Sequence, residues 1–367
     1  MPHIELTDLA KGGAHVMTVC NACRYCEQYC PVFPAIERRQ TFEWIDLAYL
    51  SNLCHNCGEC LYACQYAPPH EFGINVPRTL ADIRLASYET YCWPRPLAAA
   101  FKRQGLLTSI GLAAVFTAIL EFSGLTYSRT APGSYFYTVM SHGRMVALFG
   151  GVFAFVLFAI AVGLARFWSD LTDSLRSNDV RKTPPAYGPL LFKALRDAMS
   201  LRHLQPGSVD CASREEHRTP WRRWFHHCTF YGFLLCFAST TVAAIYHLIG
   251  WHAPYAYSSA PVVLGTIGGV LLLAGSAGLF AMRRRRDTAL LGTTQGGLDE
   301  SFIALLFLTT LTGLLLLALR ARAIMGPLLV IHLGVVLALF VTLPYGKFVH
   351  GLYRLVALVI SAREQAR

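Results

Sequence analysis

CNACRYCEQYCP at residues 20–31 and CHNCGECLYACQ at residues 54–65 decide the fold of the first part of this chain. Each stretch places four cysteines in the pattern C-x2-C-x2-C-x3-C, and the first is followed directly by Pro31. This spacing is typical of chains that bind two cubane 4Fe-4S clusters. Three cysteines two residues apart on a tight loop reach three corners of one cluster, while the fourth reaches the other cluster.

The pattern predicts a two-cluster, ferredoxin-like domain in which each cluster uses both repeats. The ligands assigned to cluster one are Cys20, Cys23, Cys26 and Cys64. The ligands assigned to cluster two are Cys54, Cys57, Cys60 and Cys30. Gln65 stands where a proline would complete the second repeat, a departure that leaves the ligands unchanged.

Disulfides and zinc are the alternative uses of these cysteines. Disulfides need an oxidising compartment, and two duplicated runs of four cysteines would be an unusual disulfide framework. Zinc normally uses two separated C-x2-C pairs and does not need this period. The other cysteines are predicted to behave as ordinary small side chains: Cys92, Cys211, Cys228 and Cys236.

The composition indicates a membrane protein. Hydrophobic residues make up 54% and charged residues 15% of the 367 residues, and the mean hydropathy is +0.40. The net charge of +10 is interpreted as basic cytoplasmic loops, and binding to nucleic acid is not expected. Residues 1–15 are polar and hold no apolar signal-peptide core, so the cysteines are expected to stay in the reducing cytoplasm.

The chain is predicted to be mainly α-helical, with two domains. Residues 1–95 form the iron–sulfur domain, which includes a short helix near residues 42–50, and the Pro-rich turn Trp93-Pro94-Arg95-Pro96 marks the boundary. Residues 96–367 form a transmembrane helical bundle, because six stretches have about the ~20 apolar residues that a spanning helix needs. These stretches are 104–123, 144–167, 225–250, 260–282, 300–319 and 326–346.

Charge predicts the orientation of these spans. Residues 166–224 carry eleven Lys and Arg, and four arginines follow one another at 283–286, whereas the loops on the other side are poor in both. The positive-inside rule then places both termini and the loop 168–224 in the cytoplasm of a bacterium, with the bundle in its inner membrane. Within that loop, residues 190–201 alternate at helical spacing, as in a helix on the membrane surface, against the cysteine domain or in solvent.

Histidines in spans three and six suggest b-type haem. His226 and His227 begin span three and His247 lies near its outer end, while His332 and His350 lie at the outer and inner ends of span six. Paired across the two helices at matching depths, these residues would hold one or two haems, with His142 as a substitute outer ligand.

Helical phase favours His226 over His227 as the inner ligand. The 21 positions from His226 to His247 leave the two about 60° apart, whereas His227 would be about 160° away. The alternative is that all these histidines form interfacial hydrogen bonds. Because no C-x-x-C-H motif is present, any haem would be bound without thioether bonds.

Four motifs give the chain a specific resemblance over nearly its whole length: VCNACRYC at 19–26, LCHNCG at 53–58, QYAPPHE at 65–71 and PYGKFVHG at 344–351. The chain resembles the tricarballylate utilisation protein B family. The resemblance implies an iron–sulfur and haem protein of the membrane that reoxidises the flavin of an FAD-dependent tricarballylate dehydrogenase. The spacing of His332 and His350 is also similar, more distantly, to that in the haem subunit of respiratory nitrate reductases.

The expected function is therefore electron transfer from a flavoprotein through two clusters and haem to membrane quinone. The chain has no strand-associated Gly-x-Gly-x-x-Gly, so it is expected to bind no dinucleotide. No catalytic residue for bond chemistry is predicted, and the remaining enzymatic role is quinone reduction. Rival hypotheses are a transporter or sensor with a regulatory iron–sulfur head, and a reductase whose clusters feed a centre on another subunit. The histidines near the two faces, rather than at the midplane, disfavour a transporter.

Overall fold

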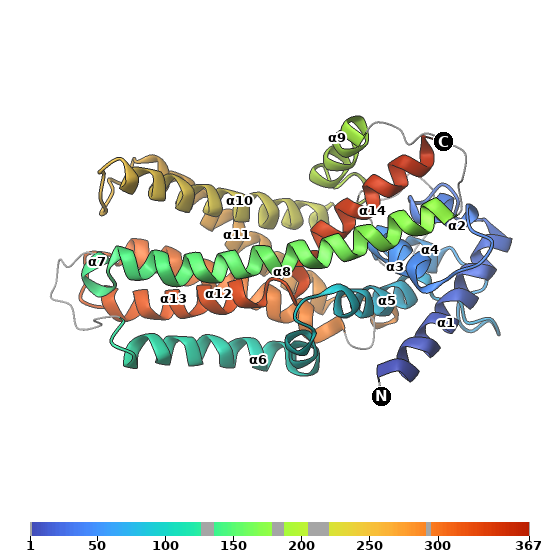
Figure 1. Ribbon diagram of the computed structural model, residues 1–367, viewed down its shortest axis with the longest axis horizontal. Helices are drawn as coiled ribbons and strands as arrows, with labels where there is room; N and C mark the ends of the chain where they lie inside the picture. Colours follow the sequence, from blue (N-terminus) through green and yellow to red (C-terminus); the bar gives the residue numbers. More distant parts are fainter. Residues whose placement is uncertain (1, 126–135, 178–186, 205–219, 291–294, 367) are drawn as a thin grey trace.

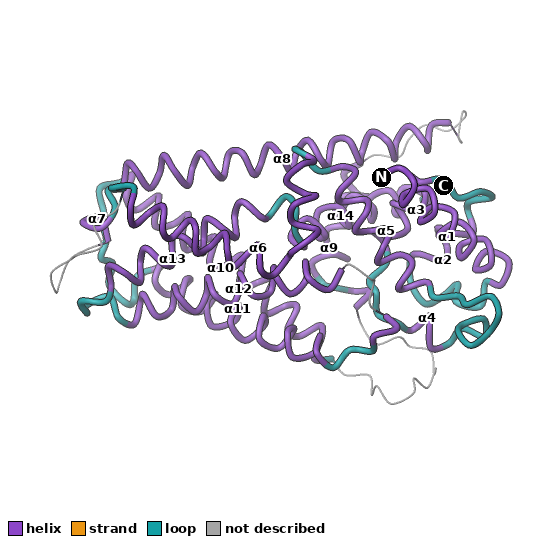
Figure 2. The backbone as a smooth tube through the Cα atoms, turned by 90° about the horizontal axis from the view of Figure 1, so that it is seen from below, coloured by secondary structure: helices purple, strands orange, loops and turns teal. Residues whose placement is uncertain are grey.

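The computed structural model describes residues 2–125, 136–177, 187–204, 220–290 and 295–366. Helices are the only regular elements in these ranges, as Figure 2 shows in purple. The long helices run side by side along the long axis of the molecule, and the cysteine domain lies at one end of them (Figure 1). The prediction of a mainly α-helical chain is confirmed.

Five helices build the cysteine domain: α1 (Pro2–Cys23), α2 (Val32–Glu37), α3 (Trp44–Leu53), α4 (Glu59–Tyr62) and α5 (Val76–Tyr91). The helix predicted near residues 42–50 is α3, which continues to Leu53. The capping box of Glu43 and Asp46 satisfies free amides at its start. The side chain of Asn75 caps α5 by accepting from the backbone N–H of Arg78. Leucine and methionine side chains from α1, α3 and α5 then fill one apolar core.

Six helices are long and apolar enough to cross a membrane, as predicted: Gly105–Phe122, His142–Leu175, Trp221–Leu248, Ala260–Arg284, Gly297–Ala318 and Met325–Thr342. They belong to α6 (Arg95–Phe122), α8 (His142–Ser177), α10 (Trp221–Leu248), α11 (Ala260–Arg284), α12 (Gln295–Ala318) and α13 (Met325–Thr342).

Helix α8 differs from the prediction. The sequence suggested a span that ends near residue 167 and a loop over 168–224, but the helix continues to Ser177. Its last turns leave the bundle and pack on the cysteine domain, where Phe167 and Leu171 are buried in the shared core. The polar residues beyond position 167 therefore mark the end of the apolar part of α8, and the helix itself continues to Ser177.

Within the former loop, α9 (Tyr187–Met199) is the amphipathic helix that the spacing at 190–201 indicates. It packs against α14 (His350–Gln365), the last helix of the chain. Leu190 and Ala194 are buried in that contact, while Phe192 on the other face is 70% exposed. The C-terminal helix was not among the predicted environments, but Ala194 joins the core that this helix shares with the cysteine domain.

Helices α10 and α11 are held together by glycines. A Cβ atom on Gly232 would lie 2.6 Å from the backbone nitrogen of Leu272, and one on Gly275 would lie 2.6 Å from that of Thr229. Only a residue without Cβ permits such a close approach between helices. This contact fixes the helix that carries His226.

Helix α14 joins the two ends of the sequence. Tyr353, Ala357 and Ile360 of this helix are buried in the core of the cysteine domain. Near the C-terminus, Glu364 accepts from Arg39 at 2.8 Å and from the hydroxyl of Tyr49 at 2.9 Å. The cysteine domain is thus completed by the end of the chain, as Figure 1 shows by the red helix against the blue ones.

Candidate functional site: cysteine loops beside a histidine pair

The cysteines of the two repeats line two adjacent cavities. Cys20, Cys23, Cys26 and Cys64 line one together with Cys60. Cys30, Cys54, Cys57 and Cys60 line the other. The last cysteine of each repeat thus lies with the first three of the other repeat, as the two-cluster pattern predicts.

The thiols are buried in sites that disfavour their ionised form. Burial, and then the neighbouring cysteines, raise the pKa of Cys20 to about 12. Burial also raises the pKa of Cys30 and Cys60 well above the ordinary value. Thiolates crowded in this way require a cation to neutralise them, so metal binding must release their protons. The four assigned sulfurs at each cavity, with Cys60 also touching the first, form a donor set that fits iron–sulfur clusters.

Backbone N–H groups lie close to the sulfurs. Those of Val32 and Phe33, at the start of α2, lower the pKa of the Cys30 thiol against the larger effect of burial. The N–H of Asn56 donates to Cys54 Sγ at 3.3 Å. Such donors stabilise negative charge on cluster sulfurs. Gly58, which directly follows Cys57, has φ of 95°, a left-handed conformation that glycine adopts without strain.

Gln65, which replaces the proline of the second repeat, has its own contact. Its Nε2 donates to Cys23 Sγ at 3.9 Å. This contact links the end of the second repeat to the first, and the spacing of the cysteines alone could not predict it.

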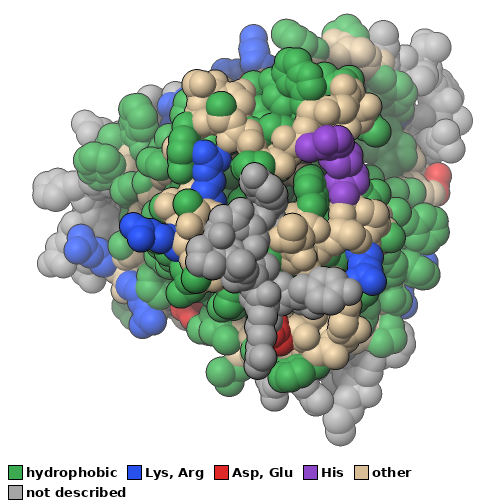
Figure 3. Space-filling view, turned by 90° about the vertical axis from the view of Figure 1, so that its left-hand side faces the viewer, with side chains coloured by type: hydrophobic (Ala, Val, Ile, Leu, Met, Phe, Trp, Pro, Cys, Tyr) green, Lys and Arg blue, Asp and Glu red, His purple; other side chains and the backbone are tan. Residues whose placement is uncertain are grey.

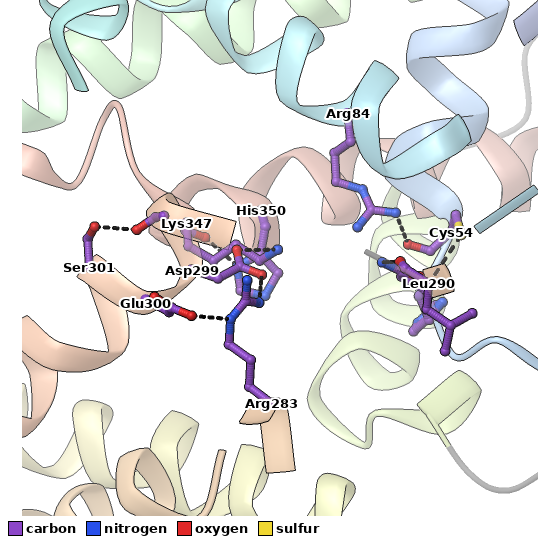
Figure 4. A network of polar contacts seen from close by, with 12 residues as sticks. Cys54, Arg84, Arg283, Leu290, Asp299, Glu300, Ser301, Lys347 and His350 are labelled. Atoms are coloured by element: carbon purple, nitrogen blue, oxygen red, sulfur yellow. Dashed lines mark hydrogen bonds and ion pairs between the residues drawn. The ribbon is translucent and has the colours of Figure 1, made fainter. Parts of the chain in front are cut away.

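Four arginines from four separate elements donate to the backbone of the second cysteine loop. Arg84 on α5 donates to the carbonyls of Ser51 at 2.7 Å and Cys54 at 2.6 Å, as Figure 4 shows for Cys54. Arg354 on α14 donates to the carbonyls of Leu53 and Cys54.

The other two arginines come from the membrane domain. Arg222 at the start of α10 donates to the carbonyls of Asn56 at 3.1 Å and His55 at 3.3 Å. Arg286, after α11, also donates to the carbonyl of Asn56. We call these four residues the arginine collar: Arg84, Arg222, Arg286 and Arg354.

Two of the predicted haem ligands lie together beside this loop. The prediction that His350 lies on the span of His332 is wrong: that helix ends at Thr342, and His350 begins α14. The ring centres of His226 on α10 and His350 are 6.0 Å apart. This separation leaves room for one metal atom between two imidazole nitrogens, at about 2 Å from each. Each histidine lies four residues, ~6 Å along the helix, from a collar arginine on its own helix.

The hydrogen bonds of this pair fit metal ligation. His350 Nδ1 donates to the carbonyl of Lys347 at 2.5 Å, which leaves Nε2 as the basic nitrogen. Figure 4 shows this contact next to the ion pair of Lys347 with Asp299. Burial, with the nearby cation of Lys347, holds the pKa of His350 well below its usual value, so the ring is neutral. Within the described residues, His226 Nδ1 is buried without a hydrogen-bond partner.

His227 points elsewhere. Its ring packs on Tyr231, with ring centres 5.6 Å apart. The structure therefore brings His226 to His350, the choice that helical phase favours.

The outer histidines form a group at the opposite end of the molecule. The rings of His142 and His247 stack with centres 3.4 Å apart, and His252, which the sequence analysis did not single out, lies 3.1 Å from His247 between Nδ1 atoms. Figure 3 looks onto this end and shows the histidine patch on the surface. No metal atom fits between rings at that stacking distance.

His332 lies apart from this group in the contacts that the structure describes. Its Nδ1 is 2.9 Å from the hydroxyl of Thr312 on α12, and Gly313 gives its ring the room to approach. An outer haem held by His332 with His247 or His142 stays a prediction.

Comparison with known proteins gives the family. A family model described as citrate utilization protein B matches residues 95–367, and its Fer4-like domain model matches residues 13–90. The chain belongs to the citrate utilization protein B family. Citrate utilization protein B of Escherichia coli is 45% identical over 359 residues, which cover 96% of this chain and 92% of that protein. No solved structure matches the chain.

Membership in the citrate utilization protein B family confirms the resemblance seen in the four motifs. A Fer4-like domain with eight cysteines around two cavities is an iron–sulfur type of domain, and the six apolar helices make the chain a multi-pass membrane protein.

Proposed function

We propose that this chain transfers electrons from the reduced flavin of a partner FAD-dependent dehydrogenase to membrane quinone. The partner would be of the tricarballylate dehydrogenase type, with a tricarboxylate such as tricarballylate or citrate as its substrate. The name of the Escherichia coli relative supports a role in citrate use. One observation carries the proposal. Helices α10 and α14 each carry one arginine that donates to the backbone of the second cysteine loop and one histidine of the pair.

Each group of residues would have its own role in this transfer. Two 4Fe-4S clusters would be held by the two cysteine sets, and one b haem by His226 and His350. Such groups supply one-electron chemistry, which splits the two-electron oxidation of a flavin into single steps. The protein itself holds the groups, buries Cys26 and Cys54 and keeps the His350 ring neutral for ligation.

The proposed electron path would begin at the surface of the cysteine domain and end in the membrane domain. Cys23 and Cys64 of the first set are partly exposed, and the neighbouring Tyr25 is 63% exposed, so a soluble flavoprotein has access there. The second set faces the collar and the histidine pair. With the cysteine domain in the cytoplasm of a bacterial cell, electrons would enter from that side and leave to quinone in the inner membrane.

Optical spectroscopy of the purified full-length protein in lipid nanodiscs tests this function. A dithionite-reduced FAD dehydrogenase of the tricarballylate type should reduce the haem, so that the b-type absorbance bands of reduced haem appear. A soluble quinone analogue should reoxidise the haem and remove these bands. The His350→Leu variant, whose side chain cannot bind iron, is the control and should keep its iron–sulfur signals but lose this haem. Protein that holds iron and shows no haem band, or a haem that the flavoprotein fails to reduce, would contradict the proposal.

A further inference from the structure

The arginine collar concentrates positive charge at one of the two cysteine sets. Arg84 is only 7% exposed, and Arg222, Arg286 and Arg354 are partly buried. Within the described ranges, none of the four forms an ion pair with a carboxylate. Buried charges are costly unless an opposite charge compensates them.

The acidic residues nearby do not balance the collar. Asp299 already pairs with Arg283 at 2.8 Å and with Lys347 at 3.0 Å. Asp287 accepts from the hydroxyl of Tyr62 at 3.2 Å and from the N–H of Ala289 at 2.8 Å. Glu59 is the acidic side chain that acts on the Cys57 thiol. Among the described residues, the four cations of the collar are thus not matched by carboxylates paired with them.

The charge does reach the sulfurs. The cation of Arg222 opposes the burial effect that raises the pKa of Cys57. Arg286 lies close enough to the same thiol to interact with it, and Arg354 close enough to Cys54. Arg354 Nε is in addition buried without a hydrogen-bond partner in the part of the chain that the structure describes.

The first cysteine loop differs by the same measure. Among the described residues, Arg24 is the one cation that donates to the backbone of residues 20–31. Arg24 is exposed and donates to the carbonyl of Asn21 at 3.0 Å. Water and salt screen an exposed charge far more than a buried one. The two sites therefore differ in buried positive charge.

We propose that the arginine collar raises the reduction potential of the cluster at the second cysteine set above that of the cluster at the first. Positive charge stabilises the reduced form, which carries one more negative charge. An electron that arrives at the exposed set then moves on to the set beside His226 and His350 and stays there until the membrane side accepts it. One electron is transferred, and no bond forms or breaks. This inference rests on the proposed iron–sulfur function.

A redox titration of full-length protein in nanodiscs, followed by electron paramagnetic resonance, tests the order. Wild-type protein should show two clusters with separate midpoints, and Cys57→Ser should remove the higher one while Cys23→Ser removes the lower. Arg286→Gln and Arg222→Gln should lower the higher midpoint, with at least a tenfold change in the oxidised-to-reduced ratio, ~59 mV for one electron. Arg286→Lys and Arg222→Lys, which keep the positive charge, should leave the higher midpoint close to its wild-type value.

Arg196→Gln is the matched control, because its side chain is 62% exposed on α9, and it should move neither midpoint. The inference is overturned if the higher midpoint belongs to the first set. It is also overturned if Gln and Lys variants behave alike while both clusters stay bound. Absence of two clusters from wild-type protein would instead refute the proposed function.

Discussion

At the scale of single residues, the crossed arrangement of the cysteines has a direct test. Cys64 belongs to the second repeat but lines the cavity of the first. Cys64→Ser should therefore remove the same cluster signal as Cys23→Ser, and non-haem iron should fall from ~8 to ~4 atoms per chain. Cys30→Ser should remove the other signal. Iron analysis and paramagnetic resonance measure both, with Cys92→Ser as the unaffected control. A Cys64→Ser protein that resembled Cys57→Ser would contradict the assignment.

The two adjacent histidines of α10 provide a matched pair. His226 faces His350, whereas His227 packs on Tyr231. His226→Leu should abolish the b-type absorbance of the inner site, because the iron would keep only one protein ligand, and His227→Leu should leave it intact. Difference spectra of purified protein distinguish them. Equal losses in both variants would show that ligation does not follow the ring geometry.

At the scale of elements, the contact of α10 with α11 depends on glycine. A Cβ on Gly275 would lie 2.5 Å from the hydroxyl oxygen of Thr229 and 2.8 Å from the carbonyl of Phe225, whereas Gly111 on α6 has open space. Gly275→Ala should separate the helices, cost about 1–3 kcal/mol of stability and weaken haem retention through His226. Thermal unfolding in detergent and haem content measure these effects. Gly111→Ala is the control, and similar losses in both variants would argue against close packing.

The contact of α14 with the cysteine domain depends on Glu364. Arg39 and Glu364 are nearly buried, with side chains 11% and 8% exposed. Glu364→Ala leaves the Arg39 cation with Asp46 alone and should destabilise the protein by about 3–5 kcal/mol. Protease cleavage of the C-terminal helix should become faster. Gln365→Ala, which removes an exposed contact with Lys193 and a hydrogen bond to Ser361 within the same helix, should have little effect, and an equally resistant Glu364→Ala protein would exclude this anchoring role.

At the scale of the whole molecule, the proposed orientation predicts which ends face the cytoplasm. Ser258 lies in the loop between α10 and α11, and Gln365 lies in the last helix. A membrane-impermeant maleimide should label Ser258→Cys in cells whose outer membrane is permeabilised and whose inner membrane is intact. Gln365→Cys should react only after lysis, and wild-type protein gives the background. The reverse pattern would refute the positive-inside assignment.

The sequence predicted the features that depend on local spacing. The cysteine repeats, the apolar stretches and the helical phase of His226 each lie within one segment, so counting residues was enough. The arginine collar joins Arg84, Arg222, Arg286 and Arg354, which are far apart in sequence, and an arginine in a basic loop looks the same whether or not it contacts a cysteine loop. The length of α8 was missed because polar residues end an apolar run without ending a helix.

The burial of α14 within the cysteine domain has a consequence for biogenesis. Tyr353, Ala357 and Ile360 are synthesised after all six spans, yet they complete a core that begins near Met17. The first ninety residues therefore find their final partners only once the six spans have been translated. Until then the cysteine domain exposes the apolar surface that α14 later covers.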